Sequence, residues 1–202
     1  MTAPGSDGLT FERNEVFRLF GQCILQLQHY EISLKSLIAA HRISIPASAV
    51  SEADIERART NRVAQTNHHT LGTLIGEMTG SFLASDVGQD AVAASERLSA
   101  VDIRMGITLP PEDFAQTTAD LRDLVVLRNF LVHHFLEQHD LGTLSGCLTA
   151  QRVLMDSLER VGQAHSDLCS WAEGMSQARE AMALYLQTGE FQDLIFKRAS
   201  KT

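Results

Sequence analysis

Apolar residues near the N-terminus recur with the period of an α-helix. Between about Phe11 and His41 they are spaced by alternating steps of three and four, which places them on one face of a helix. This face is expected to pack against a core, although one of its members, Glu31, is a carboxylate. The residues of this predicted stripe are Phe17, Phe20, Ile24, Leu27, Glu31, Leu34 and Ile38.

Similar patterns predict helices along most of the remaining chain. Pro46 ends the first helix, Gly174 is expected to bend or interrupt the last long one, and residues 101–111 look extended up to a Pro-Pro pair. Because no region is rich in strands and no internal repeat is found, the sequence predicts an all-α protein, a bundle of four or five main helices. The helices expected after the first cover about 52–65, 71–82, 90–99, 111–139, 143–188 and 190–199.

The composition fits one globular domain. With 202 residues, of which 44% are hydrophobic, the chain can form one sizeable core. We expect a single domain over residues 11–202, preceded by a disordered segment, 1–10, that is rich in Gly, Pro, Ser and Thr. The N-terminus lacks the pattern of a secretory signal, and no apolar run approaches the roughly 18 residues of a membrane span.

Cysteine content and net charge restrict the functional class. The three cysteines are far apart and form no Cys-x-x-Cys motif, which argues against disulfides or a zinc finger and favours the cytoplasm. The formal net charge of −8 excludes non-specific coating of nucleic acid, because phosphates are repelled on average. A role with RNA would therefore require a local basic cleft or a basic partner.

The stretch "DLVVLRNFLVHHFLEQHD" (123–140) combines an apolar helical pattern with polar residues in its middle. At about 100° per residue, Arg128 falls near the centre of the apolar arc. Asn129 and His133 fall together at one edge of that arc, one turn apart, and His134 lies at the opposite edge. A guanidinium among Leu and Val side chains costs free energy unless it is paired.

Glu31 is the acid that the first helix offers to this arginine, so we expect a buried or half-buried contact between Glu31 and Arg128. Two interpretations of the pair remain open. It either fixes the register of two helices, or Glu31 orients Arg128 for work in a cleft. His134 is likewise either a second cleft residue or part of a polar edge.

The sequence "RNFLVH", from Arg128 to His133, resembles the R-x(4–6)-H motif of the HEPN domain family. The polar residue after the arginine, Asn129, and the place of the motif in a late helix are also similar to that family. HEPN domains are all-α bundles, and many are metal-independent endoribonucleases that act as toxins or phage-defence effectors. The resemblance covers roughly residues 11–190 and implies such an activity on RNA, with no metal or cofactor.

The resemblance also implies roles for single residues. His133 is the candidate general acid or base, Arg128 would stabilise the phosphorane with two hydrogen bonds, and Asn129 would orient the phosphate or His133. Glu31 and His134 would support them. Arg128 and His133 lie about 140° apart on an α-helix, so they would flank a groove, and HEPN enzymes typically build one by homodimerisation. The expected products are a 2′,3′-cyclic phosphate and a 5′-hydroxyl, and an antitoxin or a nucleotidyltransferase-like protein is a further expected partner.

Other patterns compete with this interpretation. The Arg–His spacing recurs from Arg62 to His68 and His69, and from Arg160 to His165, but in both copies valine follows the arginine. No Glu-x-x-His pair of a di-metal bundle occurs, and hydrolase elbows and phosphate-binding glycine loops are absent, so we expect no metal site. The alternative function is a non-catalytic helical module for dimerisation, partner docking or nucleotide binding.

Overall fold

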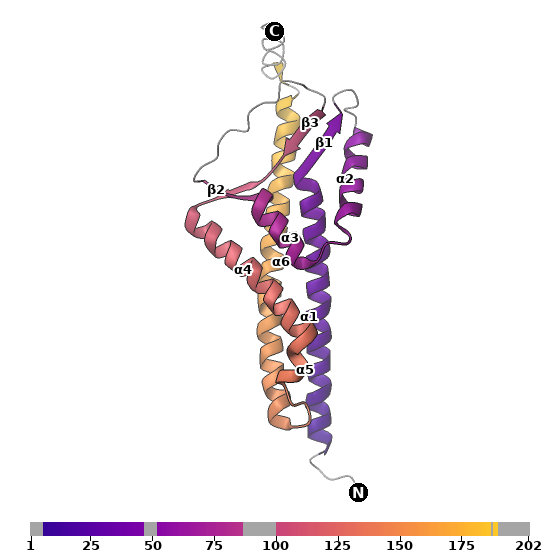
Figure 1. Cartoon of the computed structure of the whole chain (residues 1–202), viewed down its shortest axis with the longest axis vertical. Coiled ribbons are helices and arrows are strands. Elements are labelled where there is room, and N and C mark those ends of the chain that lie inside the picture. Colours follow the sequence, from indigo (N-terminus) through magenta and orange to yellow (C-terminus); the bar gives the residue numbers. More distant parts are fainter. Residues whose placement is uncertain (1–5, 47–51, 87–99, 187, 190–202) are drawn as a thin grey trace. The chain divides into compact units, whose positions relative to one another are not determined.

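The computed structural model describes residues 6–46, 52–86, 100–186 and 188–189 (Figure 1). Helices account for most of them, so the predicted all-α class and helical bundle are confirmed. The α-helices are α1 (Ser6–His41), α2 (Glu52–Thr66), α3 (Leu71–Glu77), α4 (Pro111–Asn129), α5 (Phe135–Gln138) and α6 (Leu144–Leu186). Two π-helical segments, η1 (Met78–Phe82) and η2 (Phe130–His134), continue α3 and α4. The strands are β1 (Arg42–Pro46), β2 (Leu83–Ser85), β3 (Ala100–Arg104) and β4 (Ile107–Leu109).

The chain divides into two compact units, residues 1–168 and 169–202. All candidate site residues lie in the first unit. In the second unit, α6 continues through Gly174 without the expected interruption. The predicted helices at 90–99 and 190–199 lie outside the described residues, and so do residues 1–5 of the predicted disordered segment. The rest of that segment, from Ser6, is helical, because α1 begins earlier than the expected start near Phe11.

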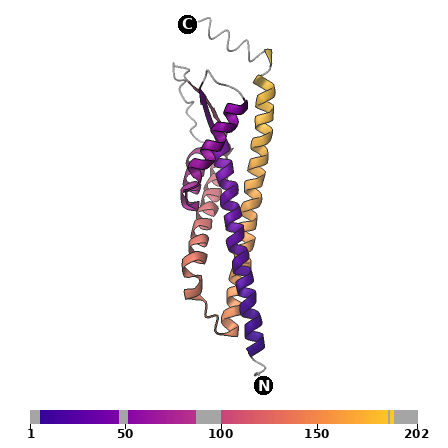
Figure 2. The same cartoon turned by 90° about the vertical axis from the view of Figure 1, so that its right-hand side faces the viewer.

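Within the first unit, α1 and the first half of α6 lie side by side and run in the same direction (Figures 1 and 2). Near the start of both helices, the Gln151 side-chain amide donates a hydrogen bond to the carbonyl of Glu12 at 3.1 Å. Further along both, the Ser33 hydroxyl lies 3.4 Å from Nε2 of His165. These contacts fix the register of the two helices that support the rest of the unit.

The buried face of α1 differs from the predicted stripe in its first half. Phe17 is 54% exposed, whereas Val16 and Leu19 are buried in its place. A strict alternation of three and four has a period of 3.5, and a straight α-helix drifts by about 20° per seven residues against that period. The observed stripe follows the longer period of the helix itself, and Glu31 lies at its edge, half-buried. Its buried members are Val16, Leu19, Cys23, Leu27, Tyr30, Leu34 and Ile38.

Two short ladders lie beyond the C-terminal ends of α1 and η1. β1 pairs antiparallel with β3, and β2 pairs parallel with β4. β3 and β4 confirm the extended chain predicted within 101–111, whereas the first two strands are too short for the pattern to reveal. A Cβ at Gly106, between β3 and β4, would lie 2.6 Å from the carbonyl oxygen of Phe82, so glycine is required for this close approach.

The helix predicted from Pro111 to about His139 is present, but a segment near its C-terminal end, η2, is not α-helical. α4, η2 and α5 form one helical run that ends at Gln138, with Glu112 and Asp113 in its first turn as expected. One face of this run contributes to the core. The buried residues of that face are Thr118, Leu121, Leu124, Leu127, Leu131 and Phe135.

Gly146 lies in the first turn of α6, tight against the preceding turn. Its N–H donates to the Thr143 hydroxyl at 3.1 Å, an N-terminal capping bond, and a Cβ there would collide with the carbonyl oxygen of Asp140. We expect Gly146→Ala to lower the free energy of unfolding, measured by urea denaturation, by about 1–3 kcal/mol, the usual cost of overpacking.

The matched control is Gly162→Ala in the middle of the same helix. A Cβ at Gly162 has no neighbour within 4 Å, so this change should be neutral or stabilise the protein by up to about 1 kcal/mol. Equal losses in the two variants would contradict the close contact between Gly146 and Asp140.

Candidate functional site

The Arg128 motif lies where α4 gives way to η2. Arg128 is half-buried, and its Nη1 donates a 3.4 Å hydrogen bond to Oδ1 of Asn129, which is exposed. His133 belongs to the π-helical segment and is exposed to solvent. The arginine therefore lies between core and surface, further out than the centre of the apolar arc where the helical angles place it, while the histidine can reach a ligand.

The π-helical turn changes the angular relation between Arg128 and His133. In a π-helix the hydrogen bonds join residues i and i+5, so one turn holds more residues than the 3.6 of an α-helix and five residues overshoot it by less. In an α-helix the same spacing leaves the two side chains about 140° apart. Because η2 occupies most of the interval between them, the two residues come nearer to one face of the helix than the sequence predicts. Such turns inside α-helices are rare and frequent at functional sites.

The neighbouring histidine, His134, takes part in a local pair. Its Nδ1 lies 3.1 Å from Oε2 of Glu137, and both side chains are largely exposed. The rings of His133 and His134 are 6.2 Å apart between centroids and lie edge to face. Both interpretations of His134 are compatible with this exposed pair.

Glu31 does not pair with Arg128. Its carboxylate lies 2.9 Å from the ammonium of Lys35, one turn further along α1, and among the described residues no ion pair joins it to Arg128. The predicted contact is therefore wrong. The reason is that the buried stripe of α1 follows the period of the helix and not the predicted spacing, so Glu31 lies at the edge of the stripe. At that edge, Lys35 of the same helix is its partner.

The outward face of the α4–α5 run is partly apolar. Val126, Val132 and Leu136 are exposed. They stand three or four residues from Asn129 and His133, which places them beside these polar residues on the same helical face. Asn129 and His133 are thus bordered by apolar side chains that are uncovered in the single chain.

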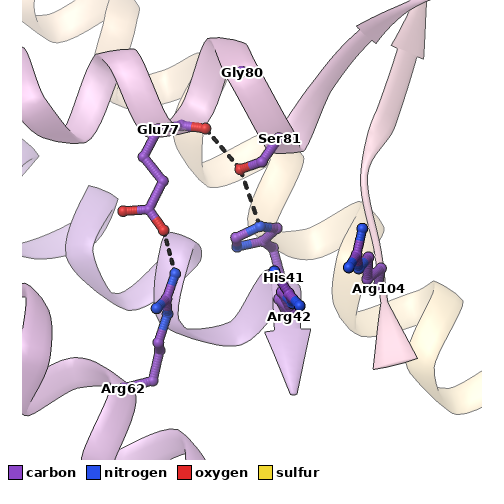
Figure 3. A pocket seen from close by; sticks show the side chains of 7 residues that line it. All are labelled: His41, Arg42, Arg62, Glu77, Gly80, Ser81 and Arg104. Carbon is purple, nitrogen blue, oxygen red and sulfur yellow. Dashed lines mark hydrogen bonds and ion pairs between the residues drawn. The ribbon is translucent and has the colours of Figure 1, made fainter. Parts of the chain in front are cut away.

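A second polar cluster, which we call the basic pocket, lies around the C-terminal end of α1 (Figure 3). It is a cavity of about 330 Å³, to which α1, β1, α2, α3, η1 and β3 contribute. The sequence interpretation missed it, because its residues come from segments far apart in the chain. The lining residues are His41, Arg42, Arg62, Glu77, Gly80, Ser81 and Arg104.

His41 is the buried member of the basic pocket, with 3% of its surface exposed. Its Nδ1 lies 2.6 Å from the carbonyl oxygen of Ile38, an acceptor, so Nδ1 carries a proton. Its Nε2 lies 3.2 Å from the hydroxyl of Ser81, which also lies 2.7 Å from the carbonyl oxygen of Glu77 and has one proton to donate to either of them (Figure 3). The ring is further held edge to face against Phe82.

The arginines of the basic pocket are placed by a carboxylate and by a strand pair. Arg62 forms an ion pair with Glu77, whose other oxygen lies 3.8 Å from Nδ1 of His69. Arg42 and Arg104 are directly opposite each other in the β1–β3 ladder. Of the competing Arg62–His69 pair, Arg62 lines the pocket and His69 contacts Glu77, another lining residue. This pair is the one pattern in the sequence that indicated the pocket.

Arg160 and His165, the last Arg–His copy in the sequence, make separate contacts. Arg160 lies 3.9 Å from Asp123, and His165 contacts Ser33 from a half-buried position. Burial raises the pKa of the Cys23 thiol to about 11, so it is not poised as a nucleophile.

Within the part of the chain that the structure describes, no group of three or more His, Cys, Asp or Glu side chains is arranged to hold a metal ion. No helix of the described residues is both long and apolar enough to cross a membrane.

Comparisons with models of known protein families, with curated proteins and with solved structures found no match to this chain.

Proposed function

We propose that the protein is a metal-independent endoribonuclease of the toxin or phage-defence type, acting at a cleft that contains Arg128, Asn129 and His133. The observation that carries the proposal is the π-helical turn of η2. It brings the arginine and the exposed histidine of the motif nearer to one helical face than the 140° of an α-helix, which favours joint action of the two residues on one phosphate.

The residues fit the chemistry of RNA cleavage by its own 2′-hydroxyl. One histidine removes the 2′-OH proton as O2′ attacks phosphorus, the bond from phosphorus to O5′ breaks, and a second histidine donates a proton to O5′. Arg128 supplies two parallel N–H donors to the equatorial phosphate oxygens, where negative charge accumulates. The products are a 2′,3′-cyclic phosphate and a 5′-hydroxyl, and no metal takes part.

A single chain supplies one motif histidine, so we propose a homodimer in which the partner subunit's His133 completes the pair. The apolar border of Val126, Val132 and Leu136 supports this arrangement. Exposed apolar side chains around polar residues are typical of surfaces that become covered by a partner, and a two-fold axis at this helix would bring both motifs to one cleft.

The proposal is tested by incubating the purified protein with RNA in the presence of EDTA and analysing the ends of the products. The wild type should cleave and leave 2′,3′-cyclic phosphate ends. Arg128→Ala should be slower by about 10²–10³-fold, the usual effect of losing one charge-stabilising donor. Arg122→Ala, which removes an exposed arginine one and a half turns earlier in α4, should retain the wild-type rate.

An inert wild type would overturn the proposal, as would cleavage by Arg128→Ala at the rate of Arg122→Ala. If the inert protein still sediments as a dimer, the same apolar border supports the second candidate function, a non-catalytic dimerisation module.

A further inference from the structure

The basic pocket is separate from the proposed ribonuclease site. Phe20 of α1 lies against Phe135, with 5.2 Å between ring centroids, and His41 follows it at the far end of the same helix. At 1.5 Å per residue, this interval of α1 spans roughly 30 Å. A ligand of the basic pocket therefore does not occupy the Arg128–His133 cleft.

We propose that the basic pocket binds a phosphate monoester group. Three of its seven lining residues are arginines and one is a glutamate, Glu77, within a chain of net charge −8. A phosphate monoester carries about −1.5 to −2 at pH 7 and strong acceptor oxygens, and the planar guanidinium group of arginine can donate two parallel hydrogen bonds to such oxygens.

The β1–β3 ladder gives a second reason for an anion. Arg42 and Arg104 are directly opposite each other, so their side chains leave the ladder on the same face. A dianion near both guanidinium groups can receive parallel N–H donors from each. The register of the two strands fixes the spacing of the two arginine side chains, whatever other contacts these side chains make.

His41 and Ser81 add neutral polar groups that are already held in place. The Ile38 carbonyl fixes the imidazole ring through Nδ1, so Nε2 and the Ser81 hydroxyl stay together at the wall of the cavity (Figure 3). The hydroxyl has a single proton, which it can direct to Nε2 of His41, to the Glu77 carbonyl or toward a phosphate oxygen. The cavity volume of about 330 Å³ lies at the lower end of the range of about 300–1,000 Å³ for small-molecule sites.

Two sources share this chemistry, a free nucleotide and the 5′-phosphate end of an RNA. Titration calorimetry of the full chain with AMP and adenosine, and with a short 2′-O-methyl oligonucleotide with and without a 5′-phosphate, separates them. The phosphate-bearing member of at least one pair should bind more tightly than its matched control. If only AMP does so, the ligand is a small nucleotide, and if only the 5′-phosphorylated oligonucleotide does so, it is an RNA end.

Variants then assign the binding to the pocket. Arg62→Gln and Arg104→Gln should each weaken binding by about tenfold or more, as expected for a charged hydrogen-bond donor. Glu77→Gln should instead tighten binding, because it raises the formal charge of the pocket. The matched control, Arg13→Gln, removes an exposed arginine near the other end of α1 and should leave the affinity unchanged.

Equal affinity for phosphorylated and unphosphorylated probes would overturn the proposal. So would an equal loss of affinity in Arg13→Gln and Arg104→Gln, since the binding would then follow net charge alone. Arg104 is exposed, so its variant keeps the test valid if Arg62→Gln fails to fold. None of these results depends on RNA cleavage, so failure of this proposal is distinguishable from failure of the proposed ribonuclease function.

Discussion

Replacing His133 with alanine is expected to slow RNA cleavage by about two to four orders of magnitude, the usual contribution of a general acid or base. In the proposed dimer each chain supplies one such histidine, so the change removes both the acid and the base of every cleft. His133 is exposed, so the variant should fold and melt like the wild type. The measurement is the single-turnover rate of cleavage of a labelled RNA in EDTA, with thermal unfolding followed by circular dichroism.

The neighbouring residue supplies the control for this prediction. His134→Ala removes an equally accessible imidazole that pairs with Glu137, and its rate should stay within about tenfold of the wild type, well short of the loss expected for a catalytic group. If His134→Ala loses as much activity as His133→Ala, the π turn presents the wrong histidine to the substrate and the assignment of His133 fails. If neither loses activity, the motif is not catalytic.

Replacing Phe135 with alanine is expected to lower the free energy of unfolding by about 3–5 kcal/mol, the range for a buried phenylalanine. Its side chain is 2% exposed. The ring lies 5.2 Å from that of Phe20 and 4.8 Å from that of His139, between centroids. It therefore joins the end of the α4–α5 run to α1, and its loss would leave a cavity beneath the proposed site. Urea denaturation followed by circular dichroism provides the measurement.

Phe17→Ala is the matched control. The period of the sequence predicts Phe17 in the core, but it is more than half exposed, so its removal should cost no more than about 0.5 kcal/mol, as for a surface substitution. Should Phe17→Ala destabilise the protein as much as Phe135→Ala, the buried face of α1 would be the one predicted from the sequence and the observed stripe would be incorrect.

Helices were predictable here because their signals are local. Pro111 with two acids in the following turn marks the start of α4, and the spacing of Leu121, Leu124 and Leu131 marks its buried face. The phase of a long helix is harder to predict, because small angular errors accumulate. This is why Phe17 is exposed, and why Glu31 pairs with Lys35 and not with Arg128.

The candidate site on α4 could be proposed from the sequence because its residues are contiguous, but η2 could not. A π turn forms when backbone N–H groups bond to the carbonyl five residues earlier and not to the carbonyl four residues earlier. The side chains of "FLVHH" do not predict which of the two carbonyls is bonded. The basic pocket depends on strand register and on the arrival of α2 and η1 beside His41. Long-range placement of this kind has no local pattern, and only the Arg62–His69 spacing pointed to it.

The π turn of the α4–α5 run holds a residue that an α-helical turn would not need. A turn closed between i and i+5 holds one residue more than a turn closed between i and i+4. Leu127, Leu131 and Phe135 can therefore be buried at successive steps of four, which an unbroken α-helix would rotate steadily off the core. Deletion of one exposed residue within Phe130–His134 would let an ordinary α-helical turn close in its place and leave Phe135 on the buried face, whereas a deletion within α4 would turn everything beyond it by about 100°. This segment can thus lose one residue without rotating the helix that follows, which the rest of the run cannot.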